Sequence, residues 1–173
     1  MPLDQALPGQ LRREEAARLE ALVRLYYPDI LRYAACRLKD RTQAEDVTQE
    51  CFIRASRYLG EHLSQAKFRA LLYKIAANLC VDAARKARPE PLADDVPHAE
   101  GGFAAVEAQD GFMRMLSPLP PEQRELILLR YGQDLKLREV ADVLGLPLRT
   151  AQSRLRAALN TLKTGFEEKG EWR

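Results

Sequence analysis

The sequence predicts an all-α protein built from two small helical domains, and three observations lead to this prediction. Ala and Leu are abundant, while aromatic residues make up only 7% of the 173 residues, a composition that favours helices packed on helices. Apolar residues recur at spacings of three and four, and no segment alternates with period two for long enough to predict a strand. A segment rich in Pro, Gly and acidic residues lies near the middle. We therefore expect domains over residues 1–88 and 103–173, joined by a flexible acidic linker over residues 89–102.

The first domain is expected to begin with two helices separated by a proline. Residues 10–24 carry a partial apolar stripe and form the first helix. Pro28 lacks a backbone N–H group and is expected to interrupt it, so that Asp29 caps a second helix. Asp40 or Thr42 then starts a third helix.

Gly60 ends that third helix, and a fourth, strongly amphipathic helix follows until Pro89 and Pro91 stop it. Its apolar face runs from Phe68 to Ala83, and its other face is polar and basic. The second domain is expected to contain a helix over residues 103–116 and another that begins near Pro121, a residue suited to the first turn of a helix.

Residues 137–156 fit a helix-turn-helix. Ala141 is small, as the close approach of the second helix requires, and Gly145 follows in the turn, where a positive φ costs a glycine little. Ala151 faces inward six residues later. The remaining inward positions are expected to be Val140, Leu144, Leu155, Leu159 and Leu162.

The second helix of this motif carries polar and basic side chains suited to DNA. Arg can bond two acceptors on a guanine edge, Gln can bond adenine, and Ser or Thr can contact phosphate or bases. The first half of such a helix enters the major groove. The candidates are Arg149, Thr150, Gln152, Ser153 and Arg156, with Arg154 near the edge of the exposed face.

Charge is distributed unevenly although the formal net charge is only +2. Residues 66–88 hold six basic residues and one acid, and residues 146–164 hold four basic residues and no acid. Between them, residues 89–110 hold six acids and no Lys or Arg. Two basic segments that coincide with candidate DNA-binding helices favour a nucleic-acid partner over a merely solvated surface.

Other chemistry is not indicated. Cys36, Cys51 and Cys80 lack the spacing of metal ligands and are expected to be reduced residues lining the core. His62 and His98 fall in predicted loops, and no phosphate-binding Gly-rich loop or nucleophile–base set is found, so neither an enzyme, nor a metal site, nor a cofactor is expected. With no signal peptide and no membrane-spanning stretch, we expect a cytoplasmic protein.

Three ordered motifs between about residues 19 and 163 resemble the extracytoplasmic-function (group four) sigma factors of the sigma-70 family. The segment EDVTQECFIRA at residues 45–55 is similar to the family's core-binding helix, and FRALLYKIAAN at residues 68–78 to its promoter-melting helix. LPPEQR at residues 119–124 and REVADVLGL at residues 138–146 match the family's fourth region.

The resemblance implies an RNA polymerase sigma factor that binds core polymerase and directs promoter recognition, melting and initiation. Asp46, Gln49 and Glu50 would dock on the clamp helices of the beta-prime subunit, and the second domain would meet the beta flap. The acidic linker, with Asp94, Asp95 and Glu100, would lie in the RNA-exit path.

Promoter contacts are implied in both domains. Residues 58–67 and the helix that follows would bind the minus-ten element, with phosphates held by basic side chains and bases stacked on Tyr73; Phe68 is interpreted as core. The minus-ten candidates are Lys67, Arg69, Tyr73, Lys74, Asn78 and Arg85. The helix-turn-helix candidates would bind the minus-thirty-five element. Gln152 stands where Arg is common, which indicates a different base preference there.

Two other functions remain open. A DNA-binding regulator would use the helix-turn-helix alone, but it has no use for the two motifs of the first domain. A sigma-like decoy would keep the fold only to bind an anti-sigma protein, but basic faces on both domains speak against it. Members of the family commonly have an anti-sigma factor, so the resemblance also implies one as a further partner.

Overall fold

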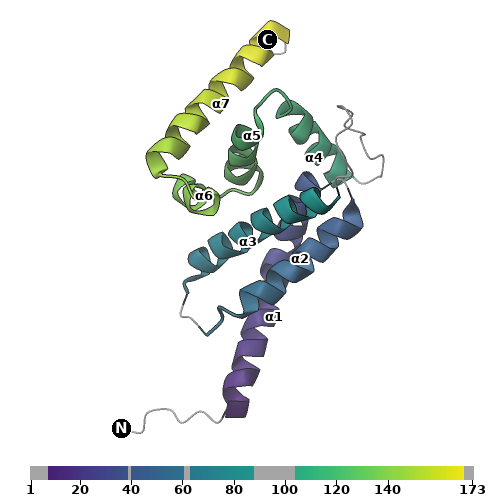
Figure 1. The fold of residues 1–173 in the computed structure, drawn as a ribbon, viewed down its shortest axis with the longest axis vertical. Helices are drawn as coiled ribbons and strands as arrows, with labels where there is room; N and C mark the ends of the chain where they lie inside the picture. The colour runs from purple at the N-terminus through teal and green to yellow at the C-terminus, as the bar shows by residue number, and fades with distance from the viewer. Residues whose placement is uncertain (1–7, 39, 61–62, 88–103, 170–173) are drawn as a thin grey trace. The chain divides into compact units, whose positions relative to one another are not determined.

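The computed structural model describes residues 8–38, 40–60, 63–87 and 104–169, and within these ranges every regular element is a helix (Figure 1). This confirms the all-α prediction. The chain divides into two compact units, Met1–Pro89 and Glu90–Arg173. The segment proposed as an acidic linker and the two histidines, His62 and His98, lie outside the described residues.

Helix α1 spans Pro8–Arg37 without a break, so the prediction that Pro28 separates two helices is wrong. A proline inside a helix removes one backbone hydrogen bond and costs about 3 kcal/mol. Burial on both sides of it outweighs that cost, because Tyr26, Ile30 and Tyr33 are all at least nine-tenths buried. Pro28 itself is exposed.

Helices α2 (Arg41–Ser56) and α3 (Gln65–Lys86) pack against each other and against α1. Of the two start residues predicted for α2, Asp40 and Thr42, it is Asp40 that caps the helix, because its side chain accepts hydrogen bonds from the backbone N–H groups of Thr42 and Gln43. Ser64 caps α3 by accepting from the N–H of Lys67. After Ser56 the chain continues in turns as far as Gly60, so α2 ends one turn earlier than predicted.

The core of the first unit lies between these three helices. Tyr27 of α1 stacks on Phe52 of α2 with ring centroids 5.9 Å apart, and Tyr33 meets Tyr73 of α3 edge-on at 5.5 Å. Cys51 and Cys80 are buried and Cys36 is half-buried, all three as free thiols. The interpretation of the cysteines as reduced core residues therefore holds for Cys51 and Cys80.

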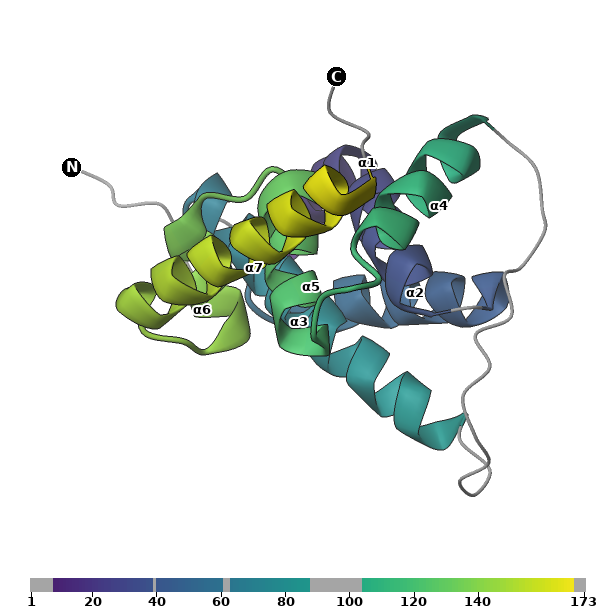
Figure 2. The same ribbon diagram turned by 90° about the horizontal axis from the view of Figure 1, so that it is seen from above.

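The second unit comprises α4 (Ala104–Met115), α5 (Pro121–Ile127), the π-helical turn η1 (Leu128–Gly132), α6 (Leu137–Leu144) and α7 (Leu148–Lys169). Pro121 occupies the first turn of α5, as predicted. Helix α5 packs against α7, and α6 packs against α7 and η1, an arrangement that Figure 2 shows from a second side.

The sequence did not predict the π-helical turn. Residues 125–129 are all buried, so α5 and η1 form the centre of this unit and not an amphipathic outer layer. Gly132 ends the turn at a crowded point, where an added Cβ would lie 3.0 Å from Leu128 Cδ1 and 3.1 Å from Phe112 Cε1. The absence of a side chain at Gly132 thus allows η1 to approach Phe112 of α4 closely.

Candidate nucleic-acid interface

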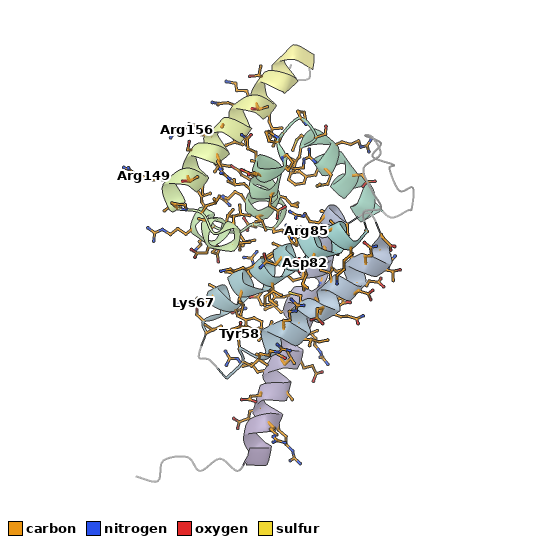
Figure 3. The ribbon with its side chains drawn as sticks, viewed as in Figure 1. Tyr58, Lys67, Asp82, Arg85, Arg149 and Arg156 are labelled. Atoms are coloured by element: carbon orange, nitrogen blue, oxygen red, sulfur yellow. The ribbon has the colours of Figure 1, made fainter. Side chains whose placement is uncertain are left out.

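The outer face of α3 is polar and carries four exposed side chains predicted to contact DNA. These are Lys67, Lys74, Asn78 and Arg85. Lys67 lies near the start of the helix, and Arg85 lies near its end beside Asp82 (Figure 3). Arg85 and Lys86 also suit the last turn of a helix, where the carbonyl ends of the backbone dipoles favour positive charge.

Tyr73 does not belong to this exposed face. Its ring is fully buried against Tyr33, so the prediction that it stacks on a DNA base is wrong. Burial raises the pKa of its hydroxyl to about 12. Arg69 is half-buried and its guanidinium lies 5.9 Å from the centre of the Tyr73 ring, so Arg69 contributes to packing as well as charge. Phe68 is buried, as interpreted from the sequence.

An open hollow of about 240 Å³ lies between the end of α2 and the middle of α3. It is lined by Arg54, Arg57, Tyr58, Ile75 and Asn78. Two arginines, an asparagine, an isoleucine and a tyrosine that is 40% exposed thus border one small space. Such a set can hold a phosphate, stack a base and bond its edge. Arg54 and Arg57 were not predicted as binding residues, because one lies on the polar side of α2 and the other directly follows its last residue.

The candidate polymerase-binding side chains lie together on α2. Asp46 and Gln49 are exposed and Glu50 is half-exposed. The Glu50 carboxylate accepts a hydrogen bond from Arg54 Nε at 2.7 Å, one turn further along the helix. A pair at this spacing on an exposed surface stabilises the helix by only about 0.3–0.5 kcal/mol, so a partner can replace it at little cost. Glu50 of the acidic face is therefore joined to Arg54, a residue that lines the hollow.

In the second unit, α6 and α7 form the predicted helix-turn-helix. Gly145 ends α6 in the left-handed conformation with φ of 64°, and the N–H of Leu146 bonds the carbonyl of Ala141 at 2.9 Å. Glu139 accepts a hydrogen bond of 2.7 Å from the N–H of Lys136 and so closes the first turn of α6. Ala151 is fully buried at the point where the two helices meet.

Helix α7 presents a polar face to solvent. Arg149, Gln152, Ser153 and Arg156 are exposed, and Thr150 is half-buried. Arg149 and Arg156 extend from the same side of the helix (Figure 3).

The buried stripe of α7 differs from the prediction at one position. It consists of Ala151, Ala158 and Leu162 together with the half-buried Leu155, whereas Leu159 is 41% exposed. Residues 151, 155, 158 and 162 follow the period of an α-helix, and residue 159 falls one step outside that stripe.

Arg154 differs from the other basic residues of α7, because its Nη1 lies 2.6 Å from Glu122 Oε2 of α5. The guanidinium is therefore partly neutralised and directed towards α5. Arg124, two residues after Glu122, has a structural role that the sequence did not reveal. It donates to the carbonyl oxygens of Leu116, Ser117 and Leu119 at 3.1–3.3 Å and holds the turn between α4 and α5.

Within the described ranges, no group of three or more His, Cys, Asp or Glu side chains gathers in a way that could hold a metal ion. In the same ranges, no helix combines the length and apolarity needed to cross a membrane. The candidate binding surfaces are the outer face of α3 with its hollow and the outer face of α7, because these faces expose the basic and amide side chains described above.

A helical unit that exposes a basic helix, followed by a unit with a helix-turn-helix, defines a DNA-binding transcription factor.

Residues 22–90 match the family described as Sigma-70 region 2, and residues 109–162 match Sigma-70, region 4. The chain is 32% identical to the probable RNA polymerase sigma-C factor of Mycobacterium bovis, over 86% of this chain and 83% of that protein. It is 30% identical to the RNA polymerase sigma-H factor of Pseudomonas aeruginosa, over 88% of each. It is 26% identical to the ECF RNA polymerase sigma factor SigW of Bacillus subtilis, over 89% of this chain and 91% of that protein.

The chain belongs to the extracytoplasmic-function sigma factors of the sigma-70 family, and it is an RNA polymerase sigma factor that directs transcription initiation.

Solved structures support the same fold. CnrH, in complex with the cytosolic domain of CnrY, is 25% identical with a TM-score of 0.64, over 90% of this chain and 97% of that chain. RpoE of Bartonella quintana, in complex with the anti-sigma factor NepR, is 23% identical with a TM-score of 0.62, over 84% of this chain and 94% of that chain.

Proposed function

We propose that the two units divide promoter recognition between them. The first unit docks on core RNA polymerase through α2 and binds the opened minus-ten strand along α3. The second unit binds the minus-thirty-five element as duplex through α7. The observation that carries this proposal is the separation of faces on α3 and α7, where one side of each helix packs in the core and the other presents cations and amides to solvent.

Contact with polymerase is assigned to Asp46, Gln49 and Glu50, with the beta-prime clamp helices as the partner. Carboxylates on an exposed helix face suit a basic surface. The second unit would in turn meet the beta flap. As in the sequence-based boundaries, the units are taken as residues 1–88 and 103–173, with residues 89–102 between them.

Contact with the minus-ten strand is assigned to the exposed α3 side chains together with the hollow that Asn78 and Tyr58 line. Lys67, Lys74 and Arg85 would hold phosphates along the helix, and Asn78 would bond a base edge. Tyr58 replaces Tyr73 as the aromatic residue available for stacking, since Tyr58 is 40% exposed.

Contact with the minus-thirty-five element is assigned to the start of α7. Arg149, Gln152, Ser153 and Arg156 would reach base edges or phosphates, and Thr150 would contact the backbone. Arg154 is assigned a lesser share because Glu122 engages it.

The chain would contribute no catalytic chemistry or cofactor of its own and would act in the cytoplasm, where polymerase meets DNA. Because the similar structures of CnrH and RpoE are complexes with CnrY and the anti-sigma factor NepR, we infer that an anti-sigma factor can cover the same faces here.

Run-off transcription tests the proposal, with purified core polymerase on fragmented genomic DNA of the source organism, with and without the protein. Discrete new start sites preceded by shared minus-ten and minus-thirty-five sequences are expected. Specific duplex binding without new transcripts would support a regulator instead, and neither activity would support a decoy.

A further inference from the structure

The N-terminal half of α1 contacts residues that follow α2 and precede α3. The side chain of Arg18 donates from Nη1 to the carbonyl oxygen of Leu59 at 3.3 Å and from Nη2 to that of Leu63 at 3.2 Å. The two acceptors are 41 and 45 residues away in sequence, and they flank the connection on its α2 side and its α3 side. One guanidinium therefore joins both ends of the connection.

A second observation places α1 beside the same connection. A Cβ added at Gly60 would lie 3.9 Å from a carboxylate oxygen of Glu15, one turn before Arg18 on α1. Leu59 is buried and fixes one end of the connection in the core, and Ser64 fixes the other end by capping α3. Each end is thus held by its own helix, and Arg18 links one end directly to the other through the Leu59 and Leu63 carbonyl groups.

We propose that Arg18 is a positioning residue for promoter recognition: by bridging the Leu59 and Leu63 carbonyls, it sets the separation of the two ends of the connection next to the minus-ten surface. The arginine fork suits this role, because its N–H groups diverge in a fixed plane and can serve two acceptors at once. A lysine ammonium is a single point and cannot hold both carbonyls in one geometry. Arg18 itself need not touch DNA.

The inference rests on the proposed assignment of the α3 surface to the minus-ten strand. Tyr58 directly precedes Leu59, and Lys67 follows Leu63 by four residues at the start of α3 (Figure 3). A change in the spacing of the two carbonyls would therefore shift Tyr58 relative to Lys67, and with them the bases that fit best.

The test uses holoenzyme reconstituted from core polymerase and the full chain carrying Arg18→Ala, Arg18→Gln or Arg18→Lys. Initiation is measured on a cognate promoter and on single-base variants of its minus-ten element, and discrimination is the ratio between them. Arg24→Ala is the matched control, since Arg24 lies on the same helix and pairs only with its neighbour Glu20 across an exposed surface, among the interactions described. Core-polymerase affinity and thermal unfolding are measured for each variant.

We expect Arg18→Ala to lower discrimination about tenfold, as the loss of charge-assisted hydrogen bonds at a fixed geometry implies. Arg18→Lys should lose most of the discrimination and Arg18→Gln part of it, while Arg24→Ala and core affinity remain within twofold of the original. An equal drop at every promoter, in parallel with a lower unfolding temperature, would show that Arg18 only stabilises the fold and would overturn the inference.

Failure of this inference and failure of the proposed function are distinguished by Lys67→Ala and Asn78→Ala. If these variants lose minus-ten discrimination while Arg18→Ala keeps it, the surface assignment stands and the role of Arg18 is refuted. If none of the variants changes discrimination, both the assignment and the role of Arg18 are refuted.

Discussion

Glu122 Oε2 lies 2.6 Å from Arg154 Nη1, so an acid at the start of α5 engages a cation in the first third of α7, the helix assigned to DNA binding. The Glu122 side chain is 71% exposed and that of Arg154 is 36% exposed. A pair so open to solvent adds little stability, on the order of 0–1 kcal/mol. Its larger effect is on the charge that α7 offers to phosphate.

Glu122→Gln should therefore strengthen binding of noncognate duplex DNA without unfolding the second unit. Removing the carboxylate releases the Arg154 charge, and the slope of log affinity against log salt should become steeper by roughly one. The measurement is a salt titration of binding to a noncognate duplex, with Arg154→Ala as the matched variant that should change the slope in the opposite direction. A slope that is unchanged in Glu122→Gln would show that Arg154 does not reach the DNA.

Arg149→Ala and Arg156→Ala distinguish base contacts from phosphate contacts. A side chain that bonds a guanine edge with two hydrogen bonds should cost about 1–3 kcal/mol at one base pair when removed. Affinities of holoenzyme for a set of minus-thirty-five variants give this number position by position. A uniform loss over all variants would assign that arginine to the backbone.

Gly145→Ala should destabilise the second unit by about 1–2 kcal/mol, because the φ of 64° at this position disfavours a side chain. The cost is conformational, since nothing lies within 4 Å of the added Cβ. Gly165→Ala is the control with the opposite expectation. Gly165 lies in α7 with equally open surroundings, so alanine should stabilise the helix by about 0.5–1 kcal/mol. Urea unfolding of both variants tests the sign of each change.

The buried thiols predict a loss of stability in alkali. Burial raises the pKa of Cys51 from 9.0 to about 12 and that of Cys80 from 9.0 to about 11. Above pH 9 the unfolded chain loses these protons while the folded chain keeps them, so the free energy of unfolding should fall as the pH rises from 9 to 11. Each thiol contributes at most about 1.4 kcal/mol per pH unit in that window.

Urea unfolding between pH 8 and pH 11 checks this expectation. A Cys51→Ala, Cys80→Ala double variant should show a flatter decline over this range, whereas Cys36→Ala, which retains both buried thiols, should follow the original chain. Identical pH profiles for the double variant and the original would contradict the assignment of the decline to these thiols.

The sequence predicted those features of the fold that depend on local chemistry. Asp40 indicated the start of α2 because its side chain can cap a helix. Gly145 indicated the turn between α6 and α7 because glycine readily adopts the positive φ found there. The prediction of a helix break at Pro28 failed because tertiary packing outweighs the low helix propensity of proline. Tyr26 and Ile30 are buried on either side of it. The π-helical turn was not predicted, and the crowding at its last residue, Gly132, involves Phe112 of another helix, a contact that no local pattern indicates.

The same distinction applies to the candidate surfaces. Exposed positions such as Lys74 and Arg156 followed from helical periodicity alone. Tyr73 did not, because its position at the edge of the apolar stripe is decided by whether Tyr33 covers it. The role of Arg18 could not be predicted for a related reason. Its hydrogen-bond acceptors lie more than 40 residues away, and they are backbone groups that carry no sequence signal.

The two-sided character of α3 has a consequence for how such proteins diversify. Phe68, Leu72 and Cys80 close the core on one side, whereas Lys74 and Asn78 face outward on the other. Substitutions on the outer side leave the packing of the core intact, so related genes can drift apart in the promoters they serve without losing a foldable protein along the way. A duplicated copy can thus acquire a new set of target genes by few changes, each of them tolerated when it first arises.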